Sequence, residues 1–81
     1  MEIPSIKEDY NNGSFQSKNY FNEFINKDEK NLDILEIGSS WGYFLNVCRE
    51  RGHNPIGIEI NKVRKDFIEN DLKIKCFYDI N

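Results

Sequence analysis

The chain has 81 residues, which is enough for one small domain. A chain of this length buries only a small fraction of its surface, and it is too short to form a large, complete enzyme. Eleven Lys and Arg residues against fourteen Asp and Glu residues give a net charge of −3, so no overall positive field favours nucleic acid as a partner. Pro4 and several charges interrupt the first ten residues, which therefore do not resemble a signal peptide, and no apolar run is long enough to span a bilayer. We expect a soluble protein of the cytoplasm that makes no contact with a membrane.

The two cysteines, Cys48 and Cys76, are far apart in the sequence and belong to no Cys-x-x-Cys or Cys/His cluster. This spacing predicts neither a disulfide framework nor a metal site. We expect both thiols to serve as small apolar side chains of the core.

Residues 1–16 are expected to form an irregular N-terminal arm, because Pro4 and the turn signal at 11–14 interrupt any periodic pattern. Residues 17–81 form the predicted domain. From Ser17 onward Tyr20, Phe21 and Phe24 recur on one helical face, and the polar stretch 27–31 ends that helix.

Residues 32–37 form a short, mostly apolar run that ends at Gly38, which is typical of a parallel strand buried on both faces. Next, Trp41, Phe44, Leu45 and Cys48 recur at helical spacing, and the segment 49–52 closes that helix with polar residues and a glycine.

Residues 55–60 predict a second strand, in which isoleucine alternates with smaller or polar residues. Asn61 is placed to cap a helix whose inward residues are Val63, Phe67 and Ile68. A third strand is expected at 74–78. The resulting order, helix followed by βαβαβ, predicts an α/β fold: a truncated Rossmann-like parallel sheet with flanking helices in three layers.

The first turn of this pattern is suited to binding a ligand. A glycine directly after a buried parallel strand, here Gly38, allows a sharp bend and close approach of a ligand to the main chain. The helix that follows presents free N–H groups and its positive dipole end at the same place. Glu59 ends the second strand beside this turn, where its carboxylate could accept hydrogen bonds from both hydroxyls of a ribose. These features predict an adenosine-containing ligand.

The segments 32–44 and 55–61, at their observed separation, resemble the first two signatures of class I S-adenosylmethionine-dependent methyltransferases. The resemblance covers roughly Leu32 to Asp79. It implies binding of S-adenosylmethionine and in-line transfer of its methyl group to an acceptor that the sequence does not identify, so that the protein contributes mainly positioning and electrostatics. It implies no catalytic residue by number.

The resemblance also implies which residues contact the cofactor. Glu36 would orient the methionine moiety, Glu59 would hold the ribose, and Asp79 would contact the adenine amino group. The loop between the first strand and its helix would lie against the cofactor. The expected cofactor contacts are Glu36, Gly38, Ser39, Ser40, Gly42, Glu59, Ile60 and Asp79. Tyr10, Tyr20 and Trp41 are candidates for covering the sulfonium, with Tyr10 as a lid on the arm.

The loop departs from the family pattern in one place, because Ser40 stands where a second glycine is usual. Ser40 and Tyr43 also replace two glycines of the dinucleotide-binding pattern, which disfavours a nicotinamide-binding Rossmann unit. No Gly-Lys-Ser/Thr follows Gly38, so a Walker-type phosphate loop is excluded. A catalytically inactive module that only binds a nucleotide or cofactor is the alternative that stays open.

Residues 38–42 also match Gly-x-Ser-x-Gly, the nucleophile elbow of α/β-hydrolases. The only histidine is His53, which lies about a dozen residues after Ser40 at the far end of the intervening helix, and the two are therefore separated by roughly 15 Å. We expect His53 to be a loop residue at the opposite edge of the sheet and exclude a catalytic triad within this chain.

The strand at 32–37 lies centrally in the usual order of such sheets, and its second neighbour has no counterpart in the sequence. An unpaired apolar strand edge is unstable in water. We therefore expect self-association, a complementing chain, or that these residues are a piece of a longer protein.

Overall fold

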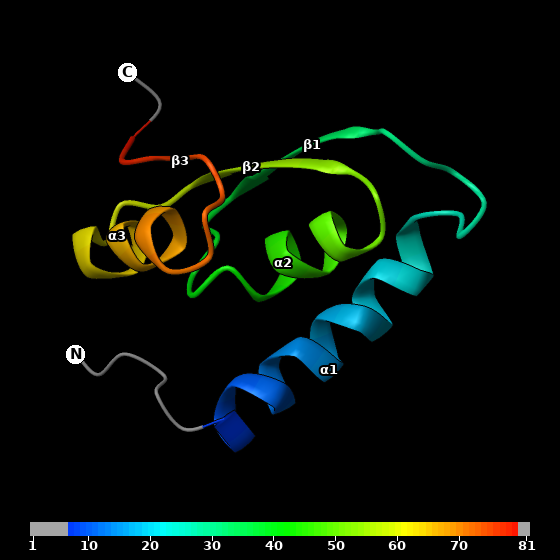
Figure 1. Cartoon of the computed structure of the whole chain (residues 1–81), viewed down its shortest axis with the longest axis horizontal. Coiled ribbons are helices and arrows are strands. Elements are labelled where there is room, and N and C mark those ends of the chain that lie inside the picture. Colours follow the sequence, from blue (N-terminus) through cyan, green and yellow to red (C-terminus); the bar gives the residue numbers. More distant parts are fainter. Residues whose placement is uncertain (1–6, 80–81) are drawn as a thin grey trace.

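The computed structural model describes residues 7–79, and it describes no side chains of residues 7–12 or of Ser14. Within this range no helix is long and apolar enough to cross a membrane. The elements, shown in Figure 1, are α1 (Lys7–Phe24), β1 (Asp33–Ile37), α2 (Tyr43–Glu50), β2 (Asn54–Ile58), α3 (Lys62–Asn70) and β3 (Cys76–Phe77).

The three strands form one parallel sheet in the order β1-β2-β3. Leu35 pairs with Ile56, and Gly57 pairs with both Glu36 and Cys76. Each parallel connection passes through a helix, as parallel strands require. The expected α/β architecture, a parallel sheet flanked by helices, is confirmed.

All three helices lie on the same side of the sheet (Figure 1). Successive right-handed βαβ crossovers that advance in one direction, from β1 to β3, place every crossover helix on one face. The expectation of three layers is therefore wrong for the described residues, and so is the expectation that β1 is buried on both faces. Leu35 is 59% exposed and Ile37 is 72% exposed on the uncovered side.

The covered face of the sheet holds the core. One cluster joins Phe21 of α1 with Val47 and Cys48 of α2, and a second joins α2 to α3 and β3 through Leu45, Ile68, Ile74 and Cys76. Both cysteines are buried and free, which confirms their expected role as core side chains.

Gly57 allows the second cluster to form. A Cβ at this position of β2 would stand 2.6 Å from both the Leu45 side chain and the Ser39 hydroxyl. The absence of a side chain in the middle of the strand therefore lets α2 and the loop before it approach the sheet closely.

Helix α1 begins at Lys7 instead of Ser17, so residues 7–16 are not the irregular arm that the turn signal predicted. A Cβ at Gly13 would lie 2.7 Å from the Tyr43 ring, which shows that the glycine provides space for packing against the start of α2. Tertiary contact along the helix has overridden the local turn preference. Residues 1–6 of the expected arm lie outside the described residues.

Helix α3 is capped by Asn61, whose side chain accepts a hydrogen bond from the Arg64 N–H at 3.1 Å, as expected. Ile68 is fully buried, but Val63 is 43% exposed and does not face the core. The inward position predicted for Val63 is therefore wrong.

A matched pair of substitutions tests this arrangement. Val47→Ala in α2 removes two methyl groups from a side chain that is 1% exposed, so it should lower the free energy of unfolding by about 1–3 kcal/mol. Val63→Ala makes the same change in α3. It should alter the free energy of unfolding by less than about 0.5 kcal/mol, because Val63 is partly exposed and alanine has the higher helix propensity. Urea denaturation of both variants measures the difference. Equal losses would contradict the burial described.

Candidate functional site

The loop from Gly38 to Gly42 leaves β1 at the carboxyl edge of the sheet. Gly38 has a φ of 77°, and its N–H donates to the carbonyl of Ile58 at 2.8 Å. A Cβ on Gly38 would meet no atom within 4 Å. Glycine is thus needed here for the left-handed backbone, and the space beside it is open to a ligand.

Other residues of this loop fasten it to the protein. Ser39 is buried, and its hydroxyl donates to the main-chain carbonyl of Glu36 at 3.0 Å. Gly42 has a φ of 78°, and a Cβ there would stand 2.7 Å from the Leu72 side chain. The positions of Ser39 and Gly42 are explained by the packing of the loop.

Glu59 follows β2 and faces this loop directly. Its Oε1 accepts the Ser40 N–H at 2.7 Å, and its Oε2 accepts the Asn61 N–H at 2.8 Å. The side chain is only 5% exposed. The structure therefore brings Glu59 and the Gly38 bend together, with the carboxylate holding the main chain of the loop.

The two other expected contacts lie beyond the ends of their strands. Ile60 is 76% exposed after β2, and Asp79 is exposed after β3. Both belong to the carboxyl edge of the sheet, because parallel strands end on the same side. Neither residue lines the cavity described next.

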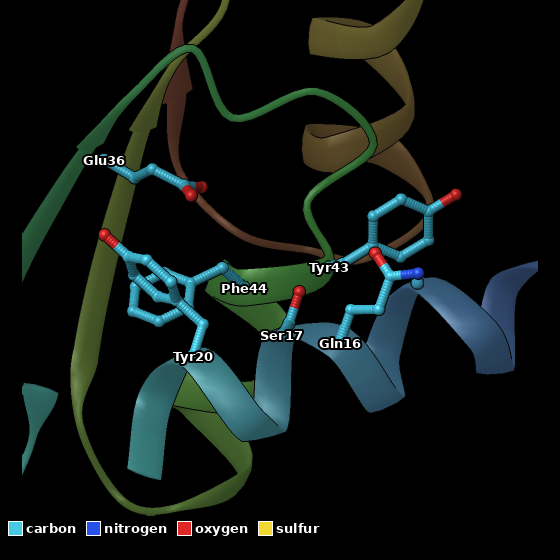
Figure 2. A pocket seen from close by; sticks show the side chains of 7 residues that line it. Gln16, Ser17, Tyr20, Glu36, Tyr43 and Phe44 are labelled. Carbon is cyan, nitrogen blue, oxygen red and sulfur yellow. The ribbon is translucent and has the colours of Figure 1, made fainter. Parts of the chain in front are cut away.

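A cavity of about 340 Å³ lies between α1, the end of β1 and the start of α2. Figure 2 shows the Glu36 carboxylate extending from β1 toward the Ser17 and Tyr20 side chains of α1. Tyr43 and Phe44 contribute from the first turn of α2. The full lining is Gly13, Gln16, Ser17, Tyr20, Glu36, Tyr43 and Phe44.

Among the described residues that line this cavity Glu36 is the one carboxylate, and its Oε1 is buried without a hydrogen-bond partner there. Burial raises the pKa of the Glu36 carboxyl to about 7; the Ser39 hydroxyl opposes this shift, and the charge of Glu59 adds to it. Glu36 is thus a buried acid that a cation would stabilise in its charged form.

The α1 side of the cavity was missed by sequence reasoning. Gly13, Gln16, Ser17 and Tyr20 are spaced at i, i+3, i+4 and i+7, which places them on one face of a helix. This helical spacing can be recognised in the sequence only if the helix is predicted to start before Gly13. The sequence predicts a role for Tyr20 only as an aromatic that could cover the sulfonium.

Trp41, another of the aromatic candidates, does not line the cavity. Trp41 is buried against Phe67, with ring centroids 5.6 Å apart, and belongs to the packing of α3. The Tyr10 side chain, expected as a lid, lies outside the described residues, although its backbone belongs to α1.

His53 precedes β2, at the edge of the sheet opposite the loop, as expected. Its Nδ1 accepts the Leu32 N–H at 3.2 Å, so it is engaged far from Ser40. Burial raises the pKa of the Cys48 and Cys76 thiols to about 11, which suppresses nucleophilic thiolate at neutral pH. Among residues 7–79 no group of three or more His, Cys, Asp or Glu side chains is arranged to hold a metal ion.

No protein-family model and no curated protein matches this sequence. The function of the chain is therefore inferred from the geometry of this edge of the sheet and from the residues that line it.

The electrostatics of Glu36 predict a pH dependence of stability. Its pKa is raised on folding from 4.5 to about 7, so as pH rises through this window the unfolded chain loses its proton first. The free energy of unfolding should therefore fall between about pH 4.5 and pH 7, with no further contribution from Glu36 above that range. Glu36→Gln should remove this fall and be more stable than the parent chain at pH 8.

Denaturant titrations from pH 4 to pH 8 measure the effect. Glu23→Gln, which removes an exposed carboxylate of α1, is the control matched in charge. If the free energy of unfolding of Glu36→Gln depended on pH as it does in the parent chain, Glu36 would not be the group whose pKa is raised on folding.

Proposed function

We propose that this chain binds S-adenosylmethionine at the carboxyl edge of its sheet and takes part in methyl transfer to an unidentified acceptor, as part of a class I methyltransferase of the cytoplasm. The observation that carries the proposal is the unpaired, buried carboxylate oxygen of Glu36, which lines a cavity next to the open space at Gly38.

The cavity suits the methionine end of such a ligand. An ammonium group beside Glu36 would supply the missing hydrogen-bond partner and favour the charged carboxylate. The Tyr20 and Phe44 rings, whose centroids are 5.4 Å apart, line the same space and offer faces that attract a sulfonium. A volume of about 340 Å³ is within the range of ligand pockets.

The adenosine end would follow the sheet edge past Gly38 toward Glu59, Ile60 and Asp79. Each carboxylate oxygen of Glu59 accepts one main-chain N–H and retains capacity for a second hydrogen bond. Because Glu59 is only 5% exposed, a ribose would reach it once the loop at Ser40 moved away from the carboxylate. Such loop movement on ligand binding is common at functional sites.

Bound S-adenosylmethionine would supply an activated methyl group to the acceptor nucleophile. The residues of this chain would position it: Glu36 at the ammonium, the Gly38 bend along the main chain, and the aromatic rings of α1 and α2 around the sulfonium. Positioning of this kind lowers the barrier without a covalent enzyme intermediate.

Calorimetric titration of the full chain with S-adenosylmethionine tests the proposal. Because a bound cation favours charged Glu36, whose pKa is about 7, the affinity should rise roughly tenfold from pH 5.5 to pH 7. Glu36→Gln should bind weakly and show no such rise, whereas Glu50→Gln, an exposed acid at the end of α2, should bind like the parent chain.

A methyl-transfer assay on candidate acceptors separates the two functions that the sequence left open. Binding with turnover supports a methyltransferase, and binding without turnover supports a module that only holds the cofactor. Failure of both S-adenosylmethionine and its demethylated product to bind would overturn both proposals.

The uncovered face of the sheet supports the proposal that the chain works together with further protein. Leu35 and Ile37 of β1 share this face with Ile56 and Phe77, as the strand register shows. β1 is also an edge strand with unpaired main-chain groups on its outer side. A second copy or a complementing chain that added a strand beside β1 would bury these side chains.

Sedimentation velocity tests this part of the proposal. The chain alone should self-associate in a concentration-dependent manner, and Ile37→Ser should shift it toward monomer without loss of helical content. A stable, compact monomer at all concentrations would contradict the proposal.

A further inference from the structure

A second cavity, of about 300 Å³, lies at the amino edge of the sheet, opposite the proposed cofactor site. Its lining includes Arg49 near the end of α2, His53 and Asn54 at the start of β2, and Lys73 and Lys75 before β3. Three cationic side chains thus converge on one small cavity in a protein whose net charge is −3. None of the described residues that line it is acidic.

The three cations are not neutralised by ion pairs. In the described part of the chain the ion pairs lie on α3 and join Lys62 and Lys65 to Asp66 and Glu69. The Asp33 carboxylate is near the cavity, and the Asn54 side chain donates to it at 3.3 Å. Arg49, Lys73 and Lys75 therefore produce a positive potential that no paired carboxylate cancels.

His53 adds a buried donor to this cavity. The residue is only 5% exposed, and its Nδ1 accepts the Leu32 N–H, which leaves the proton of the neutral ring on Nε2. An acceptor in the cavity would therefore gain a preorganised N–H donor.

Local structure also holds the cations in place. The Arg49 guanidinium donates to the Leu72 carbonyl and to Asn46 Oδ1, which uses two of its five donors and fixes its plane. Lys73 has a φ of 60°, a left-handed backbone that is unfavourable for lysine. Lys75 Nζ lies 5.2 Å from the centroid of the Phe77 ring, where it retains its N–H donors.

Two carbonyls in the last turn of α2, those of Cys48 and Arg49, accept hydrogen bonds within the chain. The N–H of Gly52 donates to the Arg49 carbonyl, and the N–H of His53 donates to the Cys48 carbonyl. The donors around the cavity are therefore not opposed by unpaired carbonyls of these residues.

We propose that the cavity formed by Arg49, His53, Lys73 and Lys75 binds a phosphate group of a ligand. A tetrahedral oxyanion can accept hydrogen bonds from the Arg49 fork and the His53 ring together while the two lysines balance its charge. The site lies at the opposite edge of the sheet from Glu36, so it is independent of the proposed cofactor site.

Amide chemical shifts of the full chain, followed by NMR during titration with inorganic phosphate at constant ionic strength, test this site. Shifts should be confined to residues around 49–54 and 72–76, with saturation in the millimolar range. The Lys73→Gln/Lys75→Gln double variant should weaken binding by about tenfold or more. Lys18→Gln/Lys27→Gln makes the same change in net charge on exposed lysines elsewhere. This control variant should bind phosphate with the same affinity as the parent chain.

The proposal is overturned if the shifts do not saturate, if they spread over the whole surface, or if both double variants bind equally. Glycerol 3-phosphate and a short single-stranded oligonucleotide then distinguish a phosphomonoester from a phosphodiester as the natural source. Tighter binding of either than of inorganic phosphate supports the site and identifies the source. Failure of both to bind would overturn it. None of these outcomes depends on S-adenosylmethionine.

Discussion

The structure of the carboxyl edge of the sheet depends on one buried carboxylate. Glu59 accepts the N–H groups of Ser40 and Asn61, and so ties the loop after β1 to the turn after β2. Each of these donors would cost about 1–3 kcal/mol if it were left buried and unpaired. The hydrogen bond from Gly38 to Ile58 and the packing of Gly42 against Leu72 hold the same loop, so the Glu59 hydrogen bonds act together with them.

The same edge holds a second acid, Glu36, whose hydrogen bonding differs from that of Glu59. The oxygens of Glu59 are satisfied by main-chain donors, whereas Glu36 has a buried oxygen without a partner, and its pKa is raised toward neutrality by burial and by the charge of Glu59. The two carboxylates, at the ends of neighbouring strands, therefore differ in their hydrogen-bond partners. Glu59 organises the loops, and Glu36 is available to a cationic group in the adjacent cavity.

The arrangement of helices on one face gives the molecule two further surfaces. The uncovered face presents Leu35 and Ile37 to solvent, and it continues into the unpaired edge of β1. The amino edge gathers Arg49, Lys73 and Lys75 around a cavity, far from the acidic residues of the carboxyl edge. The two glutamates Glu36 and Glu59 and the cavity lined by these cations thus lie at opposite edges of the sheet.

The sequence by itself determined the order of elements, the parallel sheet, the cap at Asn61, the burial of both cysteines and the placement of His53 away from Ser40. These features depend on short-range patterns: apolar runs, a glycine after a strand, and helical periodicity. The one-sided sheet also follows from crossover handedness once the strand order is known, but the order itself depends on pairing between distant segments.

Only the tertiary structure decided the start of α1, the exposure of Val63 and the roles of the two glutamates. The turn signal before Ser17 was overridden because Gly13 packs against Tyr43, a contact between residues far apart in the sequence. Glu36 and Glu59 both follow apolar strand residues and are indistinguishable by local pattern. What separates them is which main-chain N–H groups the folded loops bring within reach, and that is settled by packing in three dimensions.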